Sequence, residues 1–239
     1  MVRVLLLHGL AGKPAVWDPL IASLSDVSLP DVSYTAVELP WHGMSDGAWA
    51  HGGDPVRLVV DVAGPEYDLV VAHSFGAMLL TEAYASGRLP VRPSVLVCPF
   101  YRSSVASFDW AAMSYYLNDF HRTFEEALRV GATAAFPESR RAWLARALRD
   151  QVGPYGWMRW FETYLRTPFL DLSGVTAPQL VLSGVDDIAA RPEDGQALAK
   201  SLPHGRFSLI DSCGHFPMLE EPDLVAGLIR DFLDALELT

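Results

Sequence analysis

The sequence has few cysteines, no long apolar run and a shortage of basic residues. Its 239 residues include only Cys98 and Cys213, which are too few for a disulfide framework and lack metal-site spacing. No apolar stretch approaches the roughly 20 residues that cross a membrane. The N-terminal run, residues 2–8, has one early charge and no small-residue cleavage site, which favours a strand over a signal peptide. We therefore expect a cytoplasmic protein that does not bind membranes.

The charge balance argues against nucleic acid as a partner. Eighteen basic residues face 29 acidic ones, giving a formal net charge of -11, whereas nucleic-acid binding relies on basic surface. The charge is uneven, because residues 101–168 carry nine arginines against seven acidic residues. Such a segment on an acidic body could steer an anionic ligand, although solvated arginines on a helix face explain the same pattern.

Strand-like and helix-like runs alternate along most of the chain. Apolar runs predict strands at residues 2–8, 34–39, 68–73, 95–100, 179–184 and 206–211. Helical patterns fall between them at 17–24, 55–63, 75–86, 192–202 and within 220–238. The alternation predicts an α/β fold with about six mainly parallel strands, flanking helices and right-handed crossovers.

One long segment, residues 101–167, interrupts this alternation. It contains no strand candidate, is rich in aromatic residues and is predicted to form three or four short helices. An insertion before the last two strands would lie over the carboxyl edge of the sheet, where open α/β folds bind ligands. We therefore expect residues 1–100 and 168–239 to form the core and residues 101–167 a helical cap, or lid. A helical packing layer that never touches substrate is the alternative.

Ser74 is the candidate nucleophile. It lies in Ala72-His73-Ser74-Phe75-Gly76, between an apolar strand and a helical run. A tight strand-to-helix turn with small residues two before and two after lifts a serine hydroxyl above the sheet. A serine hydroxyl is a weak nucleophile unless a base lies nearby, so the motif calls for a partner elsewhere in the chain. A serine that merely caps the helix is the simpler interpretation.

The candidate base and acid follow the last two strands. His215 lies in a loop after residues 206–211, and an imidazole titrates near neutrality, which suits taking and returning a proton. Asp187 follows residues 179–184 and could orient that imidazole, although spacing alone leaves the adjacent Asp186 open. The order Ser, Asp, His is the one used by hydrolases with a serine elbow.

Two backbone amides are the candidate oxyanion donors. Phe75 follows the nucleophile at the start of a helix, whose dipole favours negative charge. Leu10 lies in the glycine-containing loop His8-Gly9-Leu10-Ala11-Gly12 after the first strand. That loop has neither phosphate-loop nor dinucleotide spacing, so it predicts no nucleotide cofactor.

Together these motifs resemble the α/β-hydrolase superfamily. The similarity covers His8-Gly9, residues 38–45, the Ser74 elbow, the acid loop, Gly214-His215 and the Glu-Glu-Pro of residues 220–222. The helical middle segment resembles the cap of these enzymes. Two positions depart from the pattern, since Ala72 and Trp41 stand where glycine is usual. Serine rather than aspartate at position 74 disfavours the dehalogenase and epoxide-hydrolase branches.

The resemblance implies a serine hydrolase that needs no cofactor or metal. We expect it to cleave a small-molecule carboxylic ester or thioester with an apolar or aromatic acyl group, through an acyl-enzyme. An acidic acyl-carrier protein is a candidate partner. Alternatives that use the same residues are carbon–carbon bond hydrolysis, lyase or cyclisation chemistry, or ligand binding without catalysis. The expected pocket residues are His8, Gly9, Trp41, Cys98, Phe100, Trp157 and Phe216.

Overall fold

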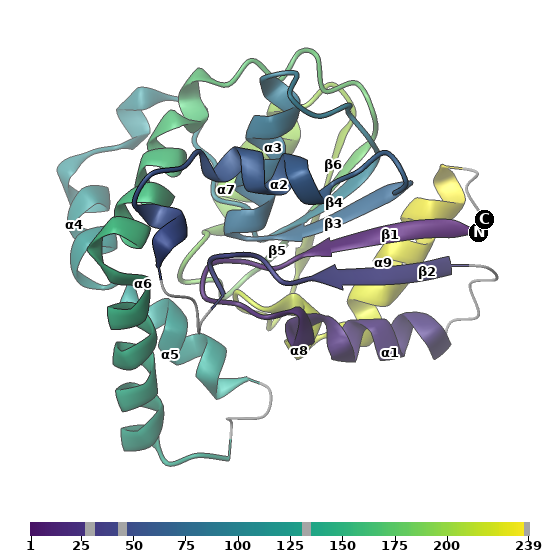
Figure 1. The fold of residues 1–239 in the computed structure, drawn as a ribbon. Coiled ribbons are helices and arrows are strands. Elements are labelled where there is room, and N and C mark those ends of the chain that lie inside the picture. The colour runs from purple at the N-terminus through teal and green to yellow at the C-terminus, as the bar shows by residue number, and fades with distance from the viewer. Residues whose placement is uncertain (27–31, 43–46, 131–134, 237–239) are drawn as a thin grey trace.

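The computed structural model describes residues 1–26, 32–42, 47–130 and 135–236. Six parallel strands form one sheet in the order β2-β1-β3-β4-β5-β6 (Figure 1), which confirms the predicted fold. Residues 43–45 of the resemblance motif and residues 237–238 of the predicted C-terminal helix lie outside the described residues. The strands are β1 (Val2–Leu7), β2 (Val32–Val37), β3 (Leu69–His73), β4 (Ser94–Val97), β5 (Gln179–Gly184) and β6 (Gly205–Ile210).

Burial along the strands follows their position in the sheet. The central strands β3, β4 and β5 are buried at every residue, because helices cover both faces of a parallel sheet. The edge strands β2 and β6 are mostly half-buried and include more polar residues. The sheet core is therefore built from the apolar runs that the sequence places in the middle strands.

Helices cover the two faces and lie close to their predicted positions. Figure 1 shows α2, α3 and α7 on one face and α1 with α9 on the other. Their bounds are α1 (Asp18–Asp26), α2 (Pro55–Val62), α3 (Phe75–Ala85), α7 (Pro192–Ser201), α8 (Pro217–Glu220) and α9 (Pro222–Ala235). Short 3-10 helices lie at η1 (Pro14–Trp17), η2 (Ala48–Ala50), η3 (Val105–Ser107) and η5 (Thr167–Phe169). None of the described helices is long and apolar enough to cross a membrane.

Two strands end at least two residues earlier than predicted. Strand β2 stops at Val37 rather than at residue 39, and the N–H of Leu39 donates instead to Nε2 of His8 at 3.0 Å. Strand β4 stops at Val97 because Cys98 adopts a positive φ of 47°, which turns the chain out of the sheet. Both early endings lie at the carboxyl edge of the sheet, beside the candidate site.

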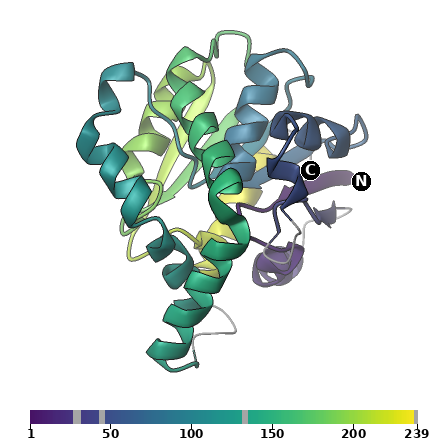
Figure 2. The same cartoon turned by 60° about the vertical axis from the view of Figure 1, so that its left-hand side comes forward.

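The segment between β4 and β5 is helical and lies beyond the carboxyl ends of the strands. It contains α4 (Trp110–Asn118), α5 (His121–Arg129) and the 29-residue α6 (Glu138–Arg166). Helix α6 is longer than the short helices predicted, but Gly153 has non-helical angles (φ 65°, ψ 173°) and precedes Pro154, so the helix is kinked there. Figure 2 shows α6 as one long bent element with α5 beside it.

Aromatic rings in edge-on and tilted contact join this helical segment to the sheet. Phe100, just after β4, meets Trp160 of α6 with ring centroids 4.9 Å apart, and Trp160 meets Phe120 at 4.5 Å. Tyr116 and Tyr164 extend the cluster, each about 5.4 Å from its neighbour. Aromatic pairs of this kind add about 1 kcal/mol each beyond the area that they bury.

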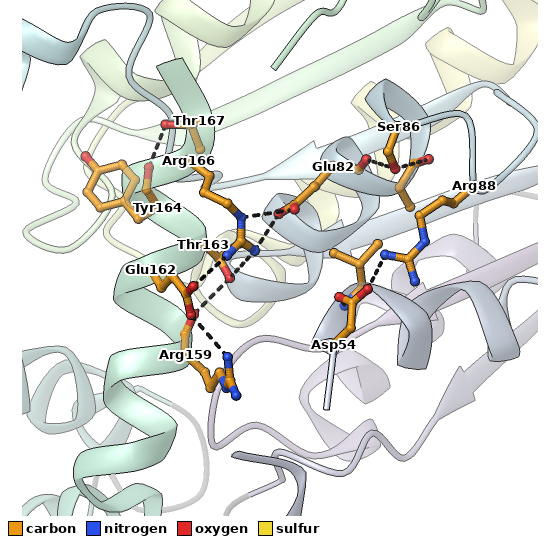
Figure 3. A network of polar contacts seen from close by, with 12 residues as sticks. Asp54, Glu82, Ser86, Arg88, Arg159, Glu162, Thr163, Tyr164, Arg166 and Thr167 are labelled. Carbon is orange, nitrogen blue, oxygen red and sulfur yellow. Dashed lines mark hydrogen bonds and ion pairs between the residues drawn. The ribbon is translucent and has the colours of Figure 1, made fainter. Parts of the chain in front are cut away.

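Polar contacts anchor the second half of α6 to the core. The guanidinium of Arg166 donates to both oxygens of Glu82 on α3, at 3.1 and 3.0 Å, and Glu162 accepts from Arg159 beside it (Figure 3). A deeper set joins α6 to the start of α7, because Tyr164 donates to Asp194 at 2.5 Å. Burial raises the pKa of the Asp194 carboxyl to about 6, although Arg102 opposes this shift.

Candidate active site

Ser74 lies at the strained junction between β3 and α3. Its backbone angles are φ 53° and ψ −116°, which a residue with a side chain rarely adopts. The flanking glycines allow the close packing around it, because a Cβ on Gly76 would lie 2.9 Å from the carbonyl oxygen of His8. A Cβ on Gly9, in the facing loop, would lie 2.9 Å from Cβ of Ser74. The turn therefore forms only where these two positions lack side chains.

The structure brings Ser74, His215 and Asp187 into one hydrogen-bonded line. Oγ of Ser74 lies 3.0 Å from Nε2 of His215, and Nδ1 of His215 lies 2.8 Å from Oδ2 of Asp187. The other Asp187 oxygen accepts the N–H groups of Ala189 and Ala190, at 2.8 and 2.9 Å. Asp186, the alternative acid, has an exposed side chain. All three aligned side chains are buried, so water competes little with their mutual bonds.

The charges around His215 favour its protonated form. Burial alone lowers the pKa of this imidazole, but the charge and hydrogen bond of Asp187, with the charges of Glu126 and Glu220, raise it above its ordinary value. An imidazole in this setting would hold a proton taken from Ser74 until that proton is passed on.

A second histidine, His73, donates a hydrogen bond to the backbone carbonyl of His215. Burial lowers the pKa of His73 well below its ordinary value, so its ring is neutral and Nε2–H donates to the His215 carbonyl at 2.8 Å. The two rings lie 4.8 Å apart. The position of His73 next to the candidate nucleophile was the only sequence signal for this contact.

The loop after β1 faces the elbow, and His8 fixes its shape. The neutral ring of His8 donates Nδ1–H to the carbonyl of Gly9 at 2.9 Å and accepts the Leu39 N–H at Nε2. Burial lowers the pKa of His8 to about 4. Among the described residues, neither the Leu10 nor the Phe75 amide donates a hydrogen bond, so both candidate oxyanion donors are free to meet a ligand.

A cavity of about 270 Å³ opens between Ser74 and the helical segment. Gly9, Phe100 and Phe216, three of the residues expected in the pocket, line it together with Ser74, Leu10 and His215. We call it the inner cavity. Its walls also include residues that the sequence did not single out as pocket residues: Phe120, Phe124, Leu148 and Trp160 from the helical segment, and Val16 and Leu219 from the core. The aromatic content of residues 101–167 was the only sequence signal for the aromatic ones.

Four residues predicted to line the pocket do not line the inner cavity. His8 and Trp41 lie behind the β1 loop, where the Trp41 indole N–H donates to the His8 carbonyl at 3.3 Å. Cys98 is fully buried, with its thiol within 4.8 Å of ligand atoms of Asp187 and His215. Trp157 lines a separate, outer cavity of about 480 Å³ within the helical segment.

Cys98, Asp187 and His215 form the one cluster of potential metal ligands found among the described residues. Their ligand atoms lie within 4.8 Å of one another. Burial raises the pKa of the Cys98 thiol well above its ordinary value, whereas a metal needs the thiolate. Asp187 and His215 already bond to each other and to neighbours. The donor set therefore suits proton transfer better than metal binding.

The chain belongs to the alpha/beta hydrolase family, whose model matches residues 4–228, and it is a hydrolase. It is 26% identical to the pimeloyl-[acyl-carrier protein] methyl ester esterase of Nitrosomonas europaea, over 92% of this chain and 91% of that protein. The corresponding esterase of Aromatoleum aromaticum is 27% identical, over 96% and 86%. Among solved structures, the N-acyl homoserine lactone degrading enzyme Est816 superposes with a TM-score of 0.69 at 20% identity, covering 97% of this chain and 93% of that one.

The low pKa of His8 predicts a pH-dependent loss of stability. The neutral ring contributes fully above about pH 6.5, the unfolded value, and its contribution falls as the pH drops toward 4. His8→Gln cannot titrate there, so wild type should lose up to about 3 kcal/mol more unfolding free energy between pH 7 and pH 4 than this variant loses. Urea unfolding at several pH values measures the difference. His204→Gln, at an exposed histidine, is the control and should follow wild type. Parallel curves for His8→Gln and wild type would contradict the assignment.

Proposed function

We propose that the protein is a serine hydrolase that cleaves carboxylic esters or thioesters through an acyl-enzyme. The observation that carries the proposal is the line of hydrogen bonds from Ser74 through His215 to Asp187, at 3.0 and 2.8 Å. The two methyl ester esterases among the relatives support ester hydrolysis as the reaction class. Their identities of 26 and 27% leave the substrate of this chain to be argued from its own cavity.

In the proposed first half-reaction, Ser74 attacks the carbonyl carbon of the ester. His215 accepts the hydroxyl proton at Nε2 while Asp187 holds its Nδ1–H, so the imidazolium forms next to a fixed negative charge. The same Nε2–H then protonates the leaving alcohol or thiol. In the second half-reaction His215 deprotonates a water that attacks the acyl-enzyme, and Ser74 recovers its proton.

The developing oxyanion would lie between the loop after β1 and the start of α3. The amides of Leu10 and Phe75 are the proposed donors, and both residues border Ser74 across the strand ends. Fixed N–H groups stabilise the tetrahedral intermediate more than the ground state, and each such donor contributes about 3 kcal/mol. His8, Trp41 and the two glycines serve this site by holding the loop against the elbow.

The lining of the inner cavity favours a substrate with a small apolar or aromatic acyl group. Four aromatic side chains, Phe100, Phe120, Phe124 and Trp160, line it beside Ser74 and His215. Phe120 and Phe124 also line the outer cavity, so they form a wall between the two spaces. We infer that residues 101–167 act as a cap on the site and that this wall limits the length of the acyl chain.

Substitutions at Asp187 and Asp186 test which of the two acts as the acid. Asp187→Asn keeps the size of the side chain but favours the wrong imidazole tautomer, so kcat should fall about 10³-fold or more. Asp186→Asn, the exposed neighbour, should stay within about threefold of wild type. Aryl ester turnover measures both, and a fluorophosphonate probe should label wild type but not Ser74→Ala.

Other outcomes of that experiment would point elsewhere. Labelling without turnover of any aryl ester would favour carbon–carbon bond hydrolysis or lyase chemistry by the same residues. A folded wild-type protein that neither turns over esters nor reacts with the probe would contradict a catalytic role. Equal losses at Asp186 and Asp187 would contradict the assigned acid.

Shortening the wall between the cavities should change the chain-length preference. Phe124→Ala would join the two spaces, and each additional buried methylene contributes about 0.8 kcal/mol. Two further methylenes should therefore raise the ratio of long-chain to short-chain kcat/KM about tenfold in a series of p-nitrophenyl esters. Leu117→Ala, which alters only the outer cavity, is the control. Phe120→Leu tests the same wall if Phe124→Ala unfolds, and an unchanged ratio in both variants would contradict a limiting wall.

We further propose that an acidic acyl-carrier protein presents the substrate. Arg140 and Arg146 are exposed on the first half of α6 and Arg141 lies beside them, on a segment with more arginines than acids. The two relatives named above act on a substrate attached to acyl-carrier protein, according to their names. A negatively charged carrier would be attracted to this end of α6, and such attraction chiefly raises the association rate.

Charge reversal at the three arginines tests this partner. Changing Arg140, Arg141 and Arg146 to Glu should lower kcat/KM at least about tenfold for a pimeloyl methyl ester carried by acyl-carrier protein, mainly at low salt. Turnover of the free methyl ester should not change. Arg230→Glu, on α9, is the control. Unchanged turnover of the carrier-bound ester would contradict the proposal.

A further inference from the structure

Carboxylates hold three consecutive amides of the loop that carries His215. The N–H groups of Gly214 and Phe216 both donate to Glu220 of α8, each at 3.0 Å. The N–H of His215 donates to Oε1 of Glu126 at 3.3 Å. Glu220 is local to the loop, whereas Glu126 lies 89 residues away on α5. One of the three contacts therefore joins the helical segment to the proposed base.

Glu126 fits tightly against this loop. A Cβ on Gly214 would lie 2.0 Å from its Oε1, so only glycine at position 214 leaves room for the carboxylate. The next nearest group to that Cβ is Oε1 of Glu220, at 3.3 Å. The sequence Gly214-His215 therefore provides both the histidine and the space for an acidic side chain from another element.

The burial of Glu126 is costly if it serves only packing. Its side chain is 5% exposed, and its Oε2 has no hydrogen-bond partner among the described residues. An incompletely bonded buried carboxylate destabilises a fold unless a positive charge compensates it. Burial raises the pKa of Glu126, while the charge of His215 lowers it. The imidazolium of His215 is thus the compensating group that the surroundings offer.

The ionisable groups around Glu126 and His215 favour a positive charge on His215 and disfavour a negative charge on Glu126. Asp187, Glu126 and Glu220 each favour a positive charge on His215. Asp187 and Glu220 oppose a negative charge on Glu126. The His73 ring, which also contacts His215, is neutral. Removing the negative charge of Glu126 should therefore make His215 easier to deprotonate.

We propose that Glu126 is a positioning residue, through which α5 orients His215 by its backbone N–H and places a negative charge beside its imidazolium. The inference rests on the proposed function, since it gives Glu126 a part in the proton transfers of His215. It also makes α5 a support of the base as well as a wall of the inner cavity, because Thr123, Phe124 and Ala127 on the same helix line that cavity.

Two substitutions separate charge from orientation. Glu126→Gln keeps an acceptor for the His215 N–H but removes the charge, so the acid limb of the kcat/KM profile should move down by about half a pH unit, with a plateau within about threefold of wild type. Glu126→Ala removes both, and its kcat should fall about tenfold or more. Glu125→Gln, the neighbour on α5, is the matched control and should leave the profile unchanged.

A titration that needs no turnover distinguishes this inference from the proposed function. In a Ser74→Ala background, the His215 imidazole can be titrated by NMR with Glu126 present or replaced by Gln. A lower His215 pKa in the Gln variant supports the charge contact, even if no ester is a substrate. The inference would be overturned if the His215 titration curves were the same with and without the Glu126→Gln change. It would also be overturned if the kcat/KM profile of Glu126→Gln matched wild type and a folded Glu126→Ala kept its kcat. If Glu126→Ala unfolds, Glu126→Gln decides alone.

Discussion

The close approach of two neighbouring strand ends is the constraint on which the candidate site depends. Strands β1 and β3 pair in parallel, so the loop after one meets the elbow after the other at the same edge of the sheet. Contact there is possible only because Gly9 and Gly76 lack side chains. The strained Ser74, the amides of Leu10 and Phe75, and the mouth of the inner cavity all follow from this contact.

The sequence predicted this edge well because parallel strands bring their carboxyl ends together whatever lies between them. Ser74, Asp187 and His215 each follow an apolar run, and the prediction of a parallel sheet was enough to expect all three at one edge of it. The sequence left Asp186 and Asp187 both open as the proposed acid, and only the geometry of the turn after β5 shows which of them contacts His215. There two backbone N–H groups hold Asp187 toward His215, while Asp186 is exposed.

The pocket was predicted less well, because its walls depend on how helices pack. Trp157 and Trp160 are three residues apart on α6, yet Trp160 lines the inner cavity and Trp157 the outer one. Which face of α6 turns inward depends on the kink at Gly153 and on the aromatic cluster, neither of which is visible from composition. His8 and Trp41 were expected in the pocket wall, but their side chains form hydrogen bonds that hold the β1 loop from behind.

Helix α5 connects the proposed base to the helical segment, and the second half of α6 connects that segment to the core. Arg166 anchors this half of α6 on Glu82 of α3. Helix α5 packs against α6, and the residue at its start belongs to the same aromatic cluster. Because Glu126 of α5 accepts the His215 N–H, the proposed base is held through the same helices that form the walls of the inner cavity.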